Sequence, residues 1–139
     1  MTERERYSVV AGIFRKDGKI LMGRRHDREG RFAGFWEFPG GKIEVGESDE
    51  EALSREFQEE LECEVTFREH FKTVSWEYPD RIIDLKFFLV ELDQVDVART
   101  DLSAHSELKW VGVEEALALM VLPANRQIIE ALILSPVSL

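Results

Sequence analysis

The chain has 139 residues, a length that suits one domain with a single hydrophobic core. Its formal net charge of −10 at pH 7 would repel a long polyanion, which argues against nucleic-acid coating and favours a small substrate accompanied by metal ions. No apolar run approaches the roughly 18 residues that span a bilayer, and the charged residues 2–6 do not form a signal peptide. We therefore expect a cytoplasmic protein without membrane or nucleic-acid partners.

Apolar runs and turn signals predict a series of strands within one mixed α/β domain, without repeats or linkers. The predicted strands cover, in chain order, residues 7–14, 19–25, 36–38, 63–78, 81–92 and 107–111. Asp17-Gly18 is typical of a tight hairpin turn, and residues 78–81 form a second turn signal. Residues 39–41, Pro-Gly-Gly, indicate a sharp break.

Three helices are predicted. They cover residues 48–61, residues 113–119 and an amphipathic segment that follows residues 122–125 and ends near Leu134. Ser48 is a good N-cap for the first helix, and the three acidic residues after it complement the positive end of the helix dipole.

Some conspicuous side chains have structural interpretations. The single cysteine, Cys63, excludes an internal disulfide framework, and we interpret it as a buried residue in a reducing compartment. The tryptophans are expected in the core or on a sheet face: Trp36, Trp76 and Trp110. The histidines show no metal-ligand spacing, and surface positions are expected for them: His26, His70 and His105.

Three glutamates near the end of the first helix fall in one sector of the helical wheel, beside the apolar stripe. They are Glu56, Glu59 and Glu60. Like charges at i and i+4 cost a few tenths of a kcal/mol, and these lie at the negative end of the helix dipole. A magnesium ion would resolve the conflict, because it takes hard oxygen ligands. The alternative is a solvated acidic face.

The segment around this helix resembles the Nudix box, a pattern of glycine, glutamate and an Arg-Glu-apolar-any-Glu-Glu core. Here it reads Gly41, Glu47 and then residues 55–63, REFQEELEC. Glu62 replaces the last glycine of the pattern. A glutamate in the left-handed conformation that glycine favours would cost roughly 1 kcal/mol, unless the helix ends differently.

The resemblance implies an α+β Nudix fold, an α/β/α sandwich with a mixed β-sheet, and assigns roles by position. Glu56, Glu59 and Glu60 look like magnesium ligands, with Mn²⁺ as a possible substitute, and the carbonyl of Gly40 resembles a further ligand. Glu56 is also a candidate to orient the attacking water. Arg55 resembles an orienting partner for Glu56.

Further members of the site are implied outside these ligands. Glu47 resembles a structural partner of the arginine in the box, and Gly41 its structural glycine. Glu107 occupies the place of an additional catalytic carboxylate, although it also fits an exposed loop glutamate. Arg25, at a strand end, and Lys42, in the glycine turn, suit phosphate oxygens; a plain surface charge is the alternative.

Within the superfamily, the chain looks like the MutT-like pyrophosphohydrolases, and the likeness covers nearly its whole length. The motifs are residues 36–44, 78–81 and 123–125. This likeness implies a base pocket formed by Phe38, Tyr78, Asn125, Tyr7, Val9 and Arg81. In members specific for 8-oxoguanine, an asparagine after Pro-Ala reads the base.

Base chemistry favours the same substrate. Oxidation turns guanine N7 into a donor while O6 stays an acceptor, and the amide of Asn125 offers both an acceptor and a donor. An aspartate, common at this place in the related CTP hydrolases, would repel O6. The competing interpretation is that Asn125 merely N-caps the last helix.

The sequence thus predicts magnesium-dependent hydrolysis of a nucleoside triphosphate, first of all 8-oxo-dGTP, to the monophosphate and pyrophosphate by a single domain. Two magnesium roles are expected, charge neutralisation at the phosphates and activation of water. A hydrolase for CTP, modified pyrimidines or a broad range of triphosphates is an alternative, as is a non-catalytic nucleotide-sensing module. The chain would act as a monomer or homodimer.

Overall fold

The computed structural model describes residues 4–26, 32–98 and 104–134. Its elements are β1 (Glu5–Lys16), β2 (Lys19–Arg25), β3 (Trp36–Glu37), β4 (Gly40–Lys42), α1 (Asp49–Leu61), β5 (Val65–Glu77), β6 (Arg81–Leu92), β7 (His105–Gly112), α2 (Val113–Ala116) and α3 (Pro123–Leu134). Every predicted strand and helix is present, although α2 ends before the predicted Leu119. In these residues, no helix is long and apolar enough to cross a membrane.

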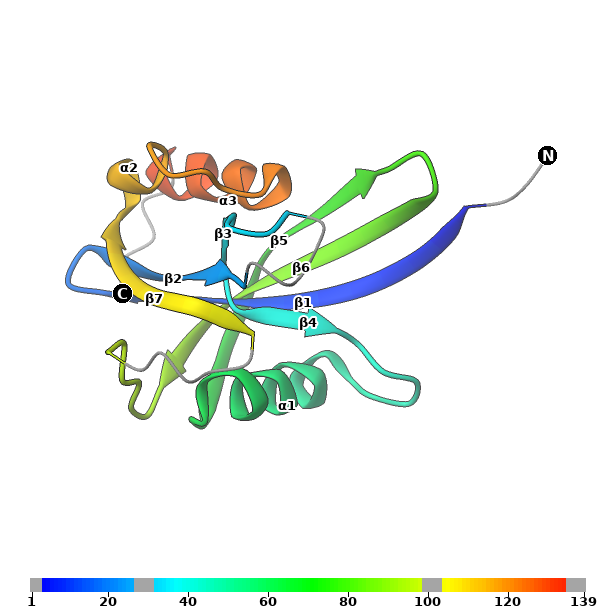
Figure 1. The fold of residues 1–139 in the computed structure, drawn as a ribbon. Helices are drawn as coiled ribbons and strands as arrows, with labels where there is room; N and C mark the ends of the chain where they lie inside the picture. Colours follow the sequence, from blue (N-terminus) through cyan, green and yellow to red (C-terminus); the bar gives the residue numbers. More distant parts are fainter. Residues whose placement is uncertain (1–3, 27–31, 99–103, 135–139) are drawn as a thin grey trace.

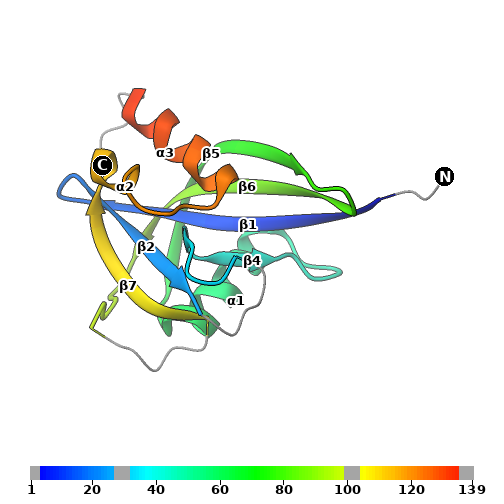
Figure 2. The same ribbon diagram turned by 45° about the horizontal axis from the view of Figure 1, so that its top comes forward.

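The strands form a mixed sheet in the order β3-β2-β1-β6-β5, with β4 paired to β1 and β7 paired to β2. β1 runs parallel to β6, and the other pairs are antiparallel. Figure 1 shows α1 against one side of the sheet and α2 and α3 against the other. Turned by 45°, Figure 2 shows β7 running beside β2. The predicted sandwich with a mixed sheet is confirmed.

Each face of the sheet carries its own apolar cluster. Leu53, Phe57 and Leu61 of α1 pack with residues of β1, β2 and β6 on one face. α3 supplies Ile128, Ile129 and other buried residues to the cluster on the opposite face. Residues 87–90 of β6 are all buried and contribute to both clusters, which confirms the predicted buried strand. The two clusters hold the sheet between the helices.

Helix α1 starts and ends with defined caps. Ser48 and Glu51 form a capping box, in which each side chain receives a hydrogen bond from the other residue's backbone. At its end Glu62 adopts the left-handed conformation, with φ 52° and ψ 42°, and its N–H donates to the carbonyl of Gln58. The box position that lacks its glycine therefore still forms the turn that a glycine would form.

The glycine turn differs from its prediction. Gly40–Lys42 is a short strand, β4, which pairs with residues 9–11 of β1, so the sharp break predicted for residues 39–41 is wrong at both glycines. A Cβ built on Gly40 would lie 2.0 Å from the carbonyl oxygen of Val10. This position needs glycine because two backbones approach closely, and not because the chain turns.

Two further sequence interpretations concern buried side chains. Cys63 is buried, as predicted, and burial raises the pKa of its thiol to about 11. Helix α3 begins at Pro123, so Asn125 lies inside the helix and the interpretation of Asn125 as its N-cap is wrong. Its side chain does not cap the helix and accepts a hydrogen bond from the backbone N–H of Phe38 instead.

Candidate active site

Arg55 ties the turn that precedes helix α1 to the helix itself. Its Nε lies 2.7 Å from Glu47 Oε2 and its Nη2 lies 2.9 Å from Glu47 Oε1, a bidentate pair. Nη2 also donates to the carbonyl of Lys42 at 2.9 Å. The bonds from Arg55 lower the pKa of the Glu47 carboxyl to about 2. The contact between Glu47 and Arg55 agrees with the structural role that the resemblance implies for Glu47.

The remaining guanidinium nitrogen of Arg55 faces two of the predicted metal ligands. Nη1 lies 3.0 Å from Glu56 Oε1 and 3.3 Å from Glu59 Oε2. The Glu56 side chain is 14% exposed, whereas that of Glu59 is 60% exposed. A Cβ built on Gly41 would lie 2.4 Å from the carboxyl carbon of Glu56. Gly41 therefore leaves the space in which the Glu56 carboxylate lies.

Glu60, the third predicted ligand of the helix, is buried. Its pKa is raised well above the ordinary value of 4.5, first by burial and then by the neighbouring Glu56 and Glu37, while the Gly40 backbone hydrogen bond opposes the shift. Among the described residues, Glu60 Oε2 has no hydrogen-bond partner. A buried carboxyl group beside two others is the environment that a bound cation stabilises.

Two residues that sequence reasoning missed lie against Glu60. His105 is 1% exposed, so the predicted surface position of this histidine is wrong. Its Nε2 lies 3.0 Å from Glu37 Oε2, and its Nδ1 lies 3.6 Å from Glu60 Oε1. The sequence held one signal for Glu37, a charged residue between Trp36 and Phe38, which are both buried on the other face. It held none for His105.

The predicted base-binding residues line a small pocket of about 170 Å³ on the α3 side of the sheet. Those that line it are Val9, Phe38, Tyr78, Arg81 and Asn125. Asn125 is 3% exposed, and its Oδ1 accepts a hydrogen bond from the backbone N–H of Phe38 at 2.9 Å. Tyr7 is not part of this lining; its ring lies beneath Lys42 Nζ, 3.8 Å from the ring centroid.

Arg25, Glu37 and Gly40 lie where the pocket meets the acidic helix end. All three line the pocket. Arg25 Nη1 lies 3.0 Å from Glu37 Oε1, and the backbone of Gly40 bonds to Glu60. Base pocket and carboxylates are therefore adjacent parts of one site.

The other predicted site residues lie at the edges. Glu107 is exposed on β7 and pairs across the strands with Arg24 of β2, two residues along the chain from His105. In residues 4–26, 32–98 and 104–134, no three histidine, cysteine, aspartate or glutamate side chains are arranged as a complete metal site. Arg55 holds Glu56 and Glu59, whereas Glu60 faces His105. The oxygen donors still suit a hard divalent cation.

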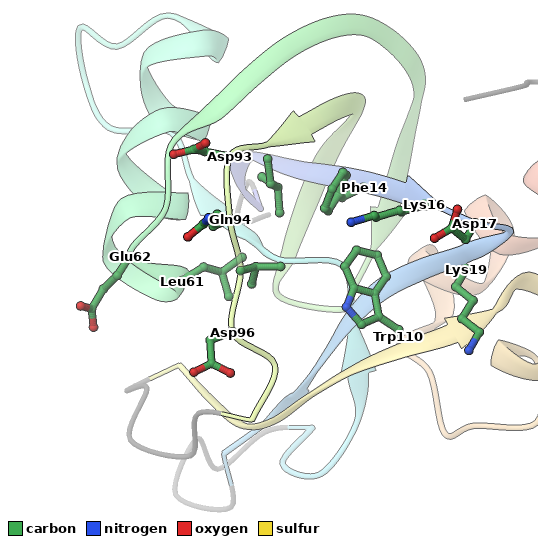
Figure 3. A pocket seen from close by; sticks show the side chains of 12 residues that line it. Phe14, Lys16, Asp17, Lys19, Leu61, Glu62, Asp93, Gln94, Asp96 and Trp110 are labelled. Carbon is green, nitrogen blue, oxygen red and sulfur yellow. The ribbon is translucent and has the colours of Figure 1, made fainter.

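A larger hollow, of about 740 Å³, contains none of these residues. Figure 3 shows it between the β1–β2 hairpin, the end of α1 and residues 92–96, with Phe14 and Trp110 on its wall. The two rings are in edge contact, 5.1 Å between centroids. Lysines and acidic residues both line this hollow, so it concentrates charge of neither sign, and volume alone does not mark the site.

Comparison with known proteins agrees with this geometry. The family model described as NUDIX domain matches residues 4–132. A CTP pyrophosphohydrolase of Escherichia coli is 40% identical over 124 residues, 88% of each chain, and an 8-oxo-dGTP diphosphatase of Proteus vulgaris is 41% identical over 91 residues, 65% of this chain and 80% of the relative. The crystal structure of a MutT protein from Methanosarcina mazei superposes with a TM-score of 0.79 at 29% identity, covering 94% of this chain and 95% of that one.

The family match spans the residues that form the sheet, helix α1 and the pocket. The predicted α+β Nudix fold is confirmed. The chain belongs to the Nudix family and is a MutT-like Nudix hydrolase.

Proposed function

We propose that this protein hydrolyses a nucleoside triphosphate to the monophosphate and pyrophosphate with magnesium held at the end of helix α1. Glu56, Glu59, Glu60 and the carbonyl of Gly40 would hold the metal. The observation that carries the proposal is Glu60: a buried carboxyl group beside Glu56 and Glu37, with one oxygen unpaired among the described residues. A cation at this place would offset the cost of burying the negative charge.

The chain's own residues would bind the metal and the phosphates and orient the catalytic carboxylate. Magnesium, or manganese in its place, supplies neutralisation of the phosphate oxygens and a lower pKa for water. Arg55, fixed by Glu47, orients Glu56 from one side, and Gly41 leaves room for it. Glu59 is exposed and would turn from Arg55 toward the metal. Arg25 and Lys42 would contact phosphate oxygens, and Glu107 stays a proposed additional carboxylate.

The pocket supports an oxidised guanine as the base. Since the Phe38 N–H is a donor, the atom of the Asn125 amide that faces it must be the oxygen, which fixes the amide's orientation. One lone pair of Oδ1 and both Nδ2 protons then remain. An acceptor and a donor on one planar group match N7–H and O6 of 8-oxoguanine.

CTP is the second candidate. The relative that matches 88% of this chain is named a CTP pyrophosphohydrolase, whereas the named 8-oxo-dGTP diphosphatase matches 65%. The same amide could accept from the cytosine amino group and donate to its ring nitrogen. Both candidates use one reaction and one metal site, so they differ only in the base.

Two glutamine variants test the reaction. Glu56→Gln and Glu60→Gln remove one charge each without changing side-chain length, and we expect both to abolish turnover in folded protein. Glu130→Gln, an exposed position on α3, is the matched control. Turnover near the wild-type rate in either variant would refute the site. Nucleotide binding by the wild-type protein without any turnover would instead support the nucleotide-sensing alternative.

A substrate panel tests the base. We expect kcat/KM with magnesium to be highest for 8-oxo-dGTP among equal concentrations of 8-oxo-dGTP, dGTP, CTP, dCTP and methylated triphosphates. Asn125→Asp should lower the value for 8-oxo-dGTP more than that for CTP, because a carboxylate repels O6. Equal values for 8-oxo-dGTP, dGTP and dCTP would reject 8-oxo-dGTP as the preferred substrate, and a maximum at CTP would select the second candidate.

A further inference from the structure

A buried histidine, His105, lies between two carboxylates from different elements. It is 1% exposed, its Nε2 lies 3.0 Å from Glu37 Oε2, and its Nδ1 lies 3.6 Å from Glu60 Oε1. Because an ionised carboxylate only accepts hydrogen bonds, the proton of the bond to Glu37 is on Nε2. The neutral ring therefore presents the lone pair of Nδ1, and no proton, on the edge that faces Glu60.

The lone pair of Nδ1 and the ionised Glu60 carboxylate gain nothing from each other directly. Both are acceptors, and 3.6 Å is longer than a hydrogen bond. Within the described part of the chain, neither His105 Nδ1 nor Glu60 Oε2 has a hydrogen-bond partner. Leaving one buried polar group unpaired costs about 1–3 kcal/mol. Two buried electron-pair donors that face each other are an arrangement that a metal ion would satisfy.

The ring is held in this orientation from two sides. A Cβ built on Gly23 would lie 2.6 Å from His105 Cδ2, so the ring packs directly on the backbone of β2. Arg25 Nη1 lies 3.0 Å from the other carboxylate oxygen of Glu37. A histidine that binds a metal almost always donates its second ring N–H to a carboxylate, a carbonyl or water, which fixes the tautomer. Glu37 is placed to be that carboxylate.

The separation of the two facing atoms favours a tetrahedral ion over an octahedral one. Zinc lies about 2.1 Å from nitrogen and oxygen ligands, so two ligands of a tetrahedral zinc ion are about 3.4 Å apart. Magnesium requires octahedral geometry at about 2.1 Å, which places neighbouring ligands only about 3.0 Å apart, and it prefers oxygen to imidazole nitrogen. The 3.6 Å between His105 Nδ1 and Glu60 Oε1 therefore fits zinc better than magnesium.

We propose that His105 Nδ1 and the Glu60 carboxylate form a binding site for Zn²⁺, with Glu37 fixing the ring. The proposal goes beyond the proposed function, since it requires neither magnesium nor hydrolysis. Two protein ligands leave the other positions to water, which agrees with the absence of a three-residue metal cluster in the part of the chain that the structure describes. Because Glu60 is also a proposed magnesium ligand, Zn²⁺ bound here would compete with magnesium.

One substitution removes the nitrogen ligand and keeps the bond that supports it. In His105→Gln the side-chain amide takes the place of Nε2, where it still donates to Glu37, and Nδ1 is lost. We expect isothermal titration calorimetry, without nucleotide or magnesium, to show Zn²⁺ binding about 10-fold or more weaker in His105→Gln than in the wild type. Mg²⁺ affinity should stay within about 3-fold of the wild-type value, because Mg²⁺ takes oxygen ligands.

His70→Gln is the matched control, because His70 is an exposed histidine on β5 whose Nε2 lies 2.7 Å from Thr73 Oγ1. It should leave Zn²⁺ affinity unchanged. Wild-type Zn²⁺ affinity in His105→Gln would overturn the proposal. Equal losses of Zn²⁺ and Mg²⁺ affinity would also overturn it, since a merely structural role of His105 predicts that result. Melting temperatures measured without metal identify a variant that does not fold.

A spectroscopic measurement on the unaltered protein covers the case in which His105→Gln does not fold. We expect the ring ¹⁵N spectrum to show the proton of His105 on Nε2, and the Nδ1 resonance to shift when Zn²⁺ is added while those of His70 stay in place. A stationary Nδ1 resonance at saturating Zn²⁺ would overturn the proposal. Hydrolysis with Mg²⁺ by a protein that binds no Zn²⁺ rejects only this site, whereas Zn²⁺ at His105 without any hydrolysis rejects only the proposed function.

Discussion

Glu60→Gln should stabilise the metal-free protein while it abolishes catalysis. The Glu60 carboxyl is 6% exposed, close to Glu56 and Glu37, and one of its oxygens has no partner among the described residues. A glutamine of the same length removes the negative charge and adds an N–H donor toward Glu56. Function and stability are therefore expected to oppose each other at this position.

The pH dependence follows from the direction of the pKa shift. Burial and the neighbouring carboxylates raise the pKa of Glu60 in the folded state above its ordinary value of 4.5. The folded state then binds more protons than the unfolded one. The contribution of Glu60 to stability is therefore fully present below the ordinary pKa of 4.5 and is lost as pH rises through the raised pKa of the folded state. The advantage of Glu60→Gln should be small at pH 5 and larger at pH 8.

The size of the stability gain expected for metal-free Glu60→Gln follows from the cost of one unpaired buried group. Such a group costs about 1–3 kcal/mol, and a change of about 2 kcal/mol in a chain of this length moves the melting temperature by about 8 °C. Magnesium should make the wild type more stable than Glu60→Gln. A ligand at 100 times its Kd adds about 2.7 kcal/mol to the free energy of unfolding of a protein that binds it. The wild type should gain that stability, and Glu60→Gln should gain little.

Thermal unfolding of the wild type and Glu60→Gln at pH 5 and pH 8, each with EDTA and with Mg²⁺, measures these differences in stability. Glu59→Gln is the matched control, since its side chain on the same helix is 60% exposed, and in EDTA it should stay within about 0.5 kcal/mol of the wild type. A metal-free Glu60→Gln protein that is less stable than the wild type at pH 8 would refute the assignment of Glu60 as an uncompensated buried carboxylate.

Three more substitutions follow from the same helix and turn. Glu62→Gly should raise the free energy of unfolding by about 0.5–1 kcal/mol in urea titration, because Glu62 occupies the left-handed conformation at φ 52°; a decrease would show that its side-chain contacts outweigh the strain. Ser48→Ala should lower it by about 1 kcal/mol through loss of the capping box, while the mid-helix control Ser54→Ala stays near zero; equal values would exclude the cap. Gly41→Ala should reduce kcat by about tenfold or more by displacing the Glu56 carboxylate, and an unchanged kcat would contradict the close approach.

The carboxylate arrangement of α1 was predictable because it is local. Residues three and four apart share one face of a helix, so the sequence alone places Glu56, Glu59 and Glu60 together. Residues on one face of a helix leave few geometries open. The pairing of Arg55 with Glu47, eight residues apart, was implied by the resemblance to the Nudix box and not by helical spacing.

The other half of the site depends on contacts that sequence spacing does not encode. Glu37 and His105 are 68 residues apart, and the register between β2 and β7 shifts between Arg24 and Arg25, which places His105 across from Arg25. A shift of one residue exchanges the faces of a strand, so alternation could not predict which of these side chains is buried. The break predicted at Gly40 was wrong for a related reason. Position 40 requires glycine because the backbone of β1 lies close to it, and that contact is not encoded in the local sequence.

The products formed from a nucleoside triphosphate test the central claim most directly. Wild-type protein with Mg²⁺ and 8-oxo-dGTP should release pyrophosphate and the monophosphate in equal amounts, resolved by ion-exchange chromatography, and EDTA or Glu60→Gln should stop the reaction while the protein stays folded. Release of orthophosphate and a diphosphate, or an unchanged rate in Glu60→Gln, would contradict the account.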